Sequence, residues 1–297
     1  MKTETLRRLR GRSSSSPKAI KRLVKGDVTQ RFGRFLVIRR VYSILQNQQQ
    51  RLNQDFHKKR LEIRDKSIFE GVSVDTCVEQ LRREGVGFGL HLPASVVEQI
   101  RQYALQTPCT EPEFDEEFLI EEVIKNGRRR DGRPVLRALV RDVMRCEAIE
   151  KIVQDPVLLK IVREYLQYWP TQITRHLTWS LVSDLPDEQI RGLYPPTTFH
   201  YDIAGYNFMT AFFYITNVDA YSGAHVMIKD SHNKKPLYMV FSSGRHSDNV
   251  VLNHYGKENQ IIIEGEKGFG FVQDPSCFHK LLPPVRADRL LLQIRYS

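Results

Sequence analysis

The sequence has few cysteines, and they lie far apart. Cys77, Cys109, Cys146 and Cys277 form no C-x-x-C pair, so we expect reduced thiols rather than a disulfide framework or a zinc site. No stretch approaches the roughly 18 apolar residues that span a bilayer, and the first eight residues lack the apolar core of a secretory signal. These absences predict a cytoplasmic protein without a membrane-spanning helix.

Several common enzyme signatures are also missing. The chain contains no G-x-S-x-G, no P-loop and no G-x-G-x-x-G. Each of these motifs supplies a backbone turn that its chemistry requires, to expose a nucleophile or to hold phosphates. Their absence argues against serine hydrolases, P-loop NTPases and Rossmann enzymes.

Positive charge is concentrated at one end of the chain. Residues 1–66 hold 19 Lys and Arg against 5 Asp and Glu, a net charge of +14, whereas residues 67–297 hold 26 against 30, a net charge of −4. A nucleic-acid enzyme is expected to carry positive charge around its binding cleft. We therefore do not expect nucleic acid as a partner, and we assign the basic character to an N-terminal extension, residues 1–70.

This extension begins with a stretch rich in Arg and Ser that is predicted to be disordered, and it continues with helical periodicity over residues 28–45. A basic amphipathic helix can lie on a membrane or bind an acidic partner, which would give residues 1–66 a peripheral membrane role. Alternatively, its apolar stripe docks on the rest of the protein and its arginines face water. We favour docking, because stripes at this spacing usually belong to a core.

The periodicity of residues 71–297 changes near residue 170. Helical patterns cover about residues 75–168, with Asp75 as an N-cap, residues 135–153 as a helix and Pro156 in the first turn of another. Beyond them, short alternating runs are separated by turn residues; they are residues 173–182, 209–218, 224–228, 236–241, 260–264, 268–272 and 289–296. The pattern predicts a mainly β fold with flanking helices, a double-stranded β-helix (jelly roll, cupin-like) with its β core at about 171–297 and a helical N-terminal half.

The densest set of potential metal ligands lies in this β half. His200 and Asp202 form an H-x-D, and residues two apart in an extended chain point to the same face. His279, near the C-terminus, is the candidate third ligand. Two imidazoles and one carboxylate leave three positions open on an octahedral metal, which suits iron(II) with a bidentate co-substrate and dioxygen.

Other histidines are weaker candidates for metal ligands. His232 competes with His279 on spacing alone, but no arginine in an apolar strand follows it at a comparable distance. We expect His225, His246 and His254 on loops or strand edges, as surface or hydrogen-bonded residues.

Arg289 follows His279 by ten residues, inside an apolar run. A buried guanidinium is unfavourable unless a carboxylate pairs with it, and arginine binds carboxylates through two parallel hydrogen bonds. One partner is a dicarboxylic co-substrate that chelates the metal at its other end. The alternative is an internal salt bridge to an Asp or Glu.

Four segments resemble the phytanoyl-CoA dioxygenase family of iron(II)- and 2-oxoglutarate-dependent oxygenases. They are residues 77–90, a helix leading into a Gly-Phe strand; residues 155–159, Asp-Pro-Val-Leu-Leu; residues 222–232, Ser-Gly-Ala-His-Val-Met-Ile-Lys-Asp-Ser-His; and residues 268–289, from Gly-Phe-Gly-Phe to the arginine. The resemblance covers roughly residues 75–297. It departs from the family at Ser222, where Asn is usual, and at Lys229-Asp230, where Pro-Gly is usual.

The resemblance implies the cofactors and the site. Iron(II) would be held by His200, Asp202 and His279, and the C5 carboxylate of the co-substrate 2-oxoglutarate by Arg289, with Thr210 beside the co-substrate. Dioxygen and a small-molecule or lipid-like metabolite would be the other reactants. Relatives that halogenate have Gly or Ala in place of the carboxylate, so Asp202 indicates hydroxylation. His232 would stabilise a turn.

Two rival functions remain from the sequence. The first is a cupin-type metal enzyme, such as an isomerase or epimerase, that does not use 2-oxoglutarate. The second is a non-enzymatic binding module that acts through the basic N-terminal arm. Under the oxygenase interpretation, deleting residues 1–66 is expected to leave 2-oxoglutarate turnover intact.

Overall fold

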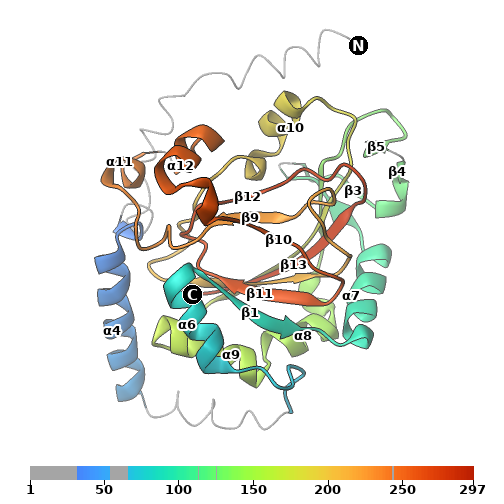
Figure 1. Cartoon of the computed structure of the whole chain (residues 1–297). Helices are drawn as coiled ribbons and strands as arrows, with labels where there is room; N and C mark the ends of the chain where they lie inside the picture. The colour runs from blue at the N-terminus through green and yellow to red at the C-terminus, as the bar shows by residue number, and fades with distance from the viewer. Residues whose placement is uncertain (1–31, 54–65, 113, 125, 243) are drawn as a thin grey trace.

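The computed structural model describes residues 32–53, 66–112, 114–124, 126–242 and 244–297 (Figure 1). The Arg- and Ser-rich stretch that was predicted to be disordered lies outside these residues. The described chain forms a β-sandwich with helices packed against its outer side.

Two sheets make up the sandwich, and the strand pairings described below are antiparallel. The larger has the order β1 (Val86–His91), β11 (Phe269–Gln273), β8 (Met209–Tyr214), β13 (Arg289–Tyr296), β7 (Ile173–Ser180), β6 (Arg137–Val140), β2 (Cys109–Thr110) and β3 (Glu117–Phe118). The smaller has the order β10 (Gln260–Ile263), β9 (His225–Ile228) and β12 (His279–Leu281). A separate pair joins β4 (Val123–Ile124) and β5 (Arg128–Arg129).

The two sheets share one apolar interior. Phe212 and Phe271 of the larger sheet form a buried cluster with Met227 and Ile263 of the smaller one. Sheets that pack face to face in this way, with antiparallel strands, form a jelly roll. The predicted fold class is confirmed.

Helices are short and lie mainly on the outer side of the larger sheet. Their bounds are α4 (Leu36–Leu52), α6 (Val74–Glu84), α7 (Ala94–Gln106), α8 (Glu147–Val153), α9 (Pro156–Leu166), α10 (Asp187–Leu193), α11 (Leu237–Val240) and α12 (Asp248–Tyr255), with 3₁₀ turns η1 (Ile120–Glu122), η2 (Val143–Arg145), η3 (Pro195–Thr197) and η4 (Lys257–Asn259). Apolar residues of α6, α7, α8 and α9 pack with Leu177, Leu292 and Ile294 of the sheet. Because side chains alternate along a strand, Thr178 and Ser180 then point into the sandwich.

Local sequence explains where two of these helices begin. Asp155 accepts hydrogen bonds from the backbone N–H groups of Val157 and Leu158, at 2.9 and 3.2 Å, with Pro156 in the first turn as expected. Ser73, rather than Asp75, caps α6 by accepting from the Thr76 N–H.

Two expected elements are wrong in type. Residues 236–241, expected as a strand, contain α11, which begins after Pro236 as its extended N-cap. The apolar run after Pro236 is too short for its periodicity to distinguish a strand from a helix. Residues 135–153, expected as one helix, contain β6, η2 and α8. The first part of that segment is a strand and not a helix because β6 pairs with β7 in the larger sheet.

Helix α4 packs on the sandwich in an orientation that the sequence did not predict. Its buried residues are Arg39, Ser43 and Gln50. Of the apolar stripe expected over residues 28–45, Tyr42 packs against the core, whereas Val41 and Leu45 are exposed. The expected docking is therefore seen only in part, and Arg39, expected to face water, is buried. The division of the chain at residue 70 stays a prediction. None of the described helices is long and apolar enough to cross a membrane.

Candidate active site

The H-x-D segment is tied to β12 by backbone hydrogen bonds. His200 and His279 exchange two of them, with N–O distances of 2.9 and 2.8 Å, and the Asp202 N–H donates to the Pro275 carbonyl at 2.8 Å. Two segments nearly eighty residues apart therefore form one short ladder. This ladder holds the two imidazoles on the same side of the backbone.

The three side chains meet at one point. One ligand atom from each of His200, Asp202 and His279 can be chosen so that all lie within 4.8 Å of one another. The His200 Nε2 to Asp202 Oδ1 distance is 3.9 Å, and the two imidazole centroids are 4.4 Å apart. Among the described residues, this is the one group of three such side chains at that spacing.

Hydrogen bonds orient each of the three side chains. The Nδ1 atom of His200 lies 2.9 Å from the Thr198 carbonyl, and that of His279 lies 2.9 Å from the Cys277 carbonyl. A carbonyl accepts only from a protonated nitrogen, so each Nδ1 carries a proton and each Nε2 keeps its lone pair. Arg295 donates to Oδ2 of Asp202 at 2.7 Å and leaves Oδ1 toward the imidazoles. Two Nε2 lone pairs and one carboxylate oxygen are a donor set for iron(II).

The electrostatics of the cluster favour the protonation states that bind a cation. Burial, followed by the neighbouring His279, lowers the pKa of His200 to about 3, and burial lowers the pKa of His279. Burial raises the pKa of Asp202, but the fields of His279 and Arg295 outweigh it and give a net lowering. The imidazoles are therefore neutral and the carboxylate is ionised near pH 7.

Arg289 lies inside the sandwich at the start of β13 and is 4% exposed. It donates to the Gly223 carbonyl at 2.6 Å and to the Ser180 hydroxyl at 3.1 Å, while its Nε has no hydrogen-bond partner among the described residues. No described Asp or Glu forms an ion pair with it, so the internal salt bridge considered from the sequence is absent from the described part of the chain. Burial lowers the pKa of this guanidinium. A carboxylate from outside the chain would satisfy it.

Thr210 is fully buried, and its hydroxyl has no hydrogen-bond partner among the described residues. On β8 it pairs with Arg295 of β13 and with Gln273 of β11, so all three point into the sandwich. Since Arg295 contacts Asp202, Thr210 lies toward the metal-ligand end of the sheet.

His225 is a buried site residue that the sequence reasoning placed wrongly on a loop or strand edge. It begins β9, is 6% exposed, and stacks on His279 with ring centroids 5.3 Å apart. Burial, followed by the neighbouring His279, lowers the pKa of His225. Its Nε2 has no hydrogen bond to a described residue. The sequence does indicate this burial, because His225 begins the apolar run His-Val-Met-Ile two residues after Gly223.

His232 lies in a turn outside the cluster. Its ring nitrogens lie 3.2 Å from the Arg82 carbonyl and 3.3 Å from the Cys277 sulfur. Its contacts are those of a residue that stabilises a turn.

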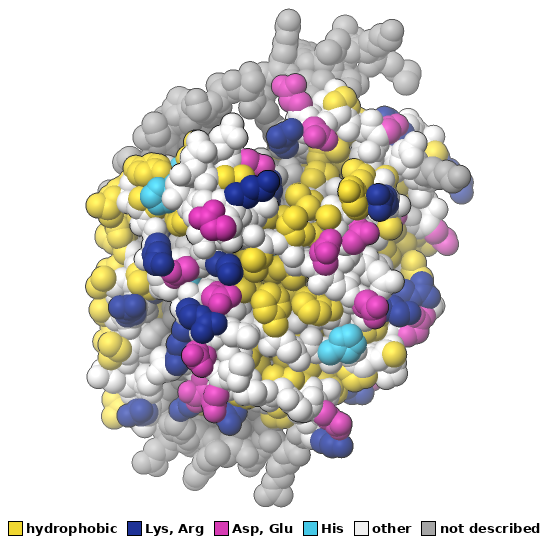
Figure 2. Space-filling model, in the orientation of Figure 1, with side chains coloured by type: hydrophobic (Ala, Val, Ile, Leu, Met, Phe, Trp, Pro, Cys, Tyr) yellow, Lys and Arg dark blue, Asp and Glu magenta, His cyan; other side chains and the backbone are white. Residues whose placement is uncertain are grey.

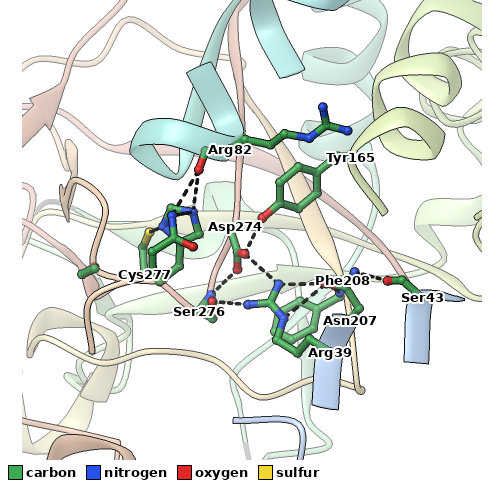
Figure 3. A network of polar contacts seen from close by, with 12 residues as sticks. Arg39, Ser43, Arg82, Tyr165, Asn207, Phe208, Asp274, Ser276 and Cys277 are labelled. Carbon is green, nitrogen blue, oxygen red and sulfur yellow. Dashed lines mark hydrogen bonds and ion pairs between the residues drawn. The ribbon is translucent and has the colours of Figure 1, made fainter. Parts of the chain in front are cut away.

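A second buried network joins the two ligand-bearing segments from outside (Figure 3). Arg39 of α4 forms a 2.7 Å ion pair with Asp274 and hydrogen bonds to Asn207 and Ser276. Asp274 and Ser276 flank Pro275, which holds the Asp202 backbone, and Asn207 lies in the loop after Asp202. Arg39 therefore fixes both loops on which the cluster depends.

The fold is a double-stranded β-helix that brings two histidines and one aspartate together beside β12. No protein-family model matches the sequence, and no curated protein matches it. Among solved structures, SnoN from nogalamycin biosynthesis, a non-heme alpha ketoglutarate dependent epimerase, is similar over 75% of this chain and 82% of its own, with 12% identity and a TM-score of 0.51. At that identity the similarity defines the fold alone.

Two further structures align with lower scores. EvdO2 from Micromonospora carbonacea var. aurantiaca covers 78% of this chain and 93% of its own, with 15% identity and a TM-score of 0.49. HygX from Streptomyces hygroscopicus, solved with nickel and 2-oxoglutarate bound, covers 76% of this chain and 87% of its own, with 13% identity and a TM-score of 0.47.

Proposed function

We propose that the protein is an iron(II)- and 2-oxoglutarate-dependent oxygenase of the phytanoyl-CoA dioxygenase type that hydroxylates a small-molecule or lipid-like metabolite. The observation that carries the proposal is the pairing of a His-Asp-His cluster with a buried arginine that has no described carboxylate partner. The first suits a divalent metal, and the second suits a dicarboxylate.

In this proposal His200, Asp202 and His279 hold the metal through Nε2, Oδ1 and Nε2. The Thr198 and Cys277 carbonyls keep the imidazoles in the binding tautomer, and Arg295 keeps the carboxylate ionised and oriented. When bound, iron(II) with 2-oxoglutarate and dioxygen would supply the oxidising chemistry.

Arg289 would bind the C5 carboxylate of 2-oxoglutarate through its guanidinium, assisted by Ser180, whose hydroxyl also lies 3.1 Å from the Tyr194 hydroxyl. Thr210, which stands opposite Arg295, would contact the co-substrate nearer its chelating end. The rings of His225, Phe212 and Phe271 contact one another and would form an apolar wall that keeps water from this space.

A related outcome has a specific observation in its favour. SnoN, whose fold this chain shares, is an alpha ketoglutarate dependent epimerase, so the same machinery can end in inversion of a carbon centre instead of hydroxylation. A 2-oxoglutarate-independent isomerase, by contrast, gives no reason for a buried Arg289 without a carboxylate. Product analysis by mass separates hydroxylation, which adds one oxygen atom, from epimerisation, which leaves the mass unchanged.

The test is formation of succinate from 2-oxoglutarate by the full-length protein with iron(II) in air. We expect turnover in the wild type and in Arg286→Ala, an exposed arginine on the same segment, and loss of turnover in His279→Ala and Arg289→Ala. Equal succinate formation in all four proteins, or none in the wild type across a substrate screen, contradicts the proposal.

A further inference from the structure

Helix α4 exposes a row of apolar side chains to solvent, although its Tyr42 packs against the core. Val37 is 69% exposed, Ile44 58% and Leu52 85%, and Val41 and Leu45 on the same side are also about half exposed or more. Val37, Val41, Ile44 and Leu45 recur at three- and four-residue spacing, so they form one stripe along the helix, and Leu52 lies two turns beyond Leu45. Leaving such a stripe in water is unfavourable unless something covers it.

The orientation of the helix is fixed by polar contacts on its other side. Arg39 forms the buried ion pair with Asp274, Ser43 accepts a hydrogen bond from Asn207 at 2.9 Å, and the Gln50 amide exchanges two 2.8 Å hydrogen bonds with the Trp169 backbone (Figure 3 shows the first two). Rotating the helix to bury its stripe would break all of these contacts and leave Asp274 buried without its counter-ion. The stripe is therefore held outward.

The apolar surface continues onto α11, which lies at the N-terminal end of α4 (Figure 1). Phe35 packs edge-on against Phe241 with ring centroids 5.7 Å apart, and Arg34 donates to the Val240 carbonyl. Leu237, Tyr238 and Phe241 are more than half exposed. Hydrophobic side chains are visible along this edge of the molecule in Figure 2. We call the exposed apolar residues of α4 and α11 the α4–α11 face.

The charge on α4 has one sign. The sequence contains no Asp or Glu between Asp27 and Asp55, and Arg40 and Arg51 are exposed on α4 itself. The segment to which α4 belongs, residues 1–66, carries a net charge of +14. An apolar stripe bordered by arginines has the two features that bind a helix into the interface of an anionic bilayer.

We propose that the α4–α11 face docks on an anionic lipid surface, with its aliphatic and aromatic side chains in the headgroup region and its arginines on lipid phosphates. Nucleic acid would use the arginines but gain nothing from the aliphatic stripe. A second copy of the chain meeting this face about a twofold axis would bring the same arginines together, with no acidic residue on α4 to offset them. A lipid surface matches both the stripe and the charge.

The test is sedimentation of the full-length protein with vesicles of phosphatidylcholine alone or mixed with phosphatidylglycerol. The test variant carries Val37→Gln, Val41→Gln and Ile44→Gln, which keep every basic residue. The matched control carries Ile124→Gln, Met144→Gln and Val285→Gln, three comparably exposed apolar residues outside α4 and α11. All six positions are exposed, so both variants should melt at the wild-type temperature.

We expect the wild type and the control to sediment with the phosphatidylglycerol vesicles and not with phosphatidylcholine alone. The α4 variant should bind at least tenfold more weakly, and Arg40→Gln/Arg51→Gln should weaken binding in low salt more than in high salt. Wild-type protein that fails to sediment with either vesicle, or an α4 variant that binds as well as the wild type, overturns the proposal. A wild-type dimer in light scattering that the α4 variant converts to monomer also overturns it, because the face would then join two chains.

Discussion

Arg289 illustrates how one buried charge can indicate a ligand. Among the described residues its guanidinium donates to neutral groups, the Gly223 carbonyl and the Ser180 hydroxyl, and forms no ion pair. A buried charge without a counter-ion destabilises a fold by several kcal/mol. Under the proposed function, 2-oxoglutarate supplies that counter-ion in each catalytic cycle. Arg289 would then contribute to the binding of 2-oxoglutarate and not to the stability of the fold.

This use of Arg289 can be measured in steady-state kinetics. Arg289→Ala should raise the KM for 2-oxoglutarate about 100-fold, because a charge-assisted bidentate contact contributes roughly 2–4 kcal/mol. Arg289→Lys should raise it less, since an ammonium keeps the charge but not the fork. Arg286→Ala should leave it unchanged. An Arg289→Ala enzyme with the wild-type KM would contradict this role.

His225 should affect co-substrate binding without affecting the metal. Its neighbours Phe212 and Phe271 are aromatic, so His225→Phe fits the space and should change the free energy of unfolding by no more than about 1.5 kcal/mol. If its unpartnered Nε2 contacts bound 2-oxoglutarate, the KM should rise about tenfold while metal affinity, measured by calorimetry, stays the same. A wild-type KM in this variant would assign His225 to packing alone.

At the scale of elements, the sequence predicted the strands better than the helices. The runs that became β8, β9, β10, β11 and β13 are short, mainly apolar and bounded by turn residues, which is typical of strands buried in a sandwich. Residues 236–241 became a helix because six residues are too few to distinguish the two periods.

The orientation of α4 could not be read from its periodicity. A stripe indicates that one side of a helix is apolar, but the partner that fixes its orientation, Asp274, lies 235 residues away from Arg39 in sequence. The H-x-D and His279 could be proposed as a site from their residue types and spacing. The Arg295 contact to Asp202 and the burial of His225 could not be predicted in this way. Both depend on which distant strands pair, and local patterns in the sequence do not show this.

Arg39 should hold the ligand loops together. Arg39→Ala leaves Asp274 buried without its cation and should lower the free energy of unfolding by about 3–5 kcal/mol, measured by urea denaturation. It should also weaken metal binding about tenfold or more, as loss of outer-shell partners does. Arg40→Ala, one residue along and exposed, should change stability by less than about 0.5 kcal/mol.

A conservative pair of variants separates positioning from general stability. Arg39→Lys keeps the charge near Asp274 and should recover part of the metal affinity. Arg39→Met with Asp274→Asn removes the buried charge and should recover stability without recovering metal affinity. If both variants recover both properties equally, Arg39 contributes stability only.

At the scale of the whole molecule, the N-terminal extension and the sandwich depend on each other. The sequence suggested that residues 1–66 could be deleted with 2-oxoglutarate turnover intact, but the contacts of Arg39 lead us to the opposite expectation. A chain that starts at residue 54 should lose metal affinity and stability to the same extent as Arg39→Ala. A chain that starts at residue 32 and so retains α4 should keep both. Equal turnover in the two truncated chains would show that α4 is dispensable.

The central claim is that one metal and one dicarboxylate share the interior of the sandwich, and anomalous diffraction from crystals soaked with manganese(II) and 2-oxoglutarate tests it most directly. We expect one anomalous peak bounded by Nε2 of His200, Oδ1 of Asp202 and Nε2 of His279, with 2-oxoglutarate density running from it to the Arg289 guanidinium. A peak elsewhere, or density for 2-oxoglutarate that does not reach Arg289, would contradict the claim.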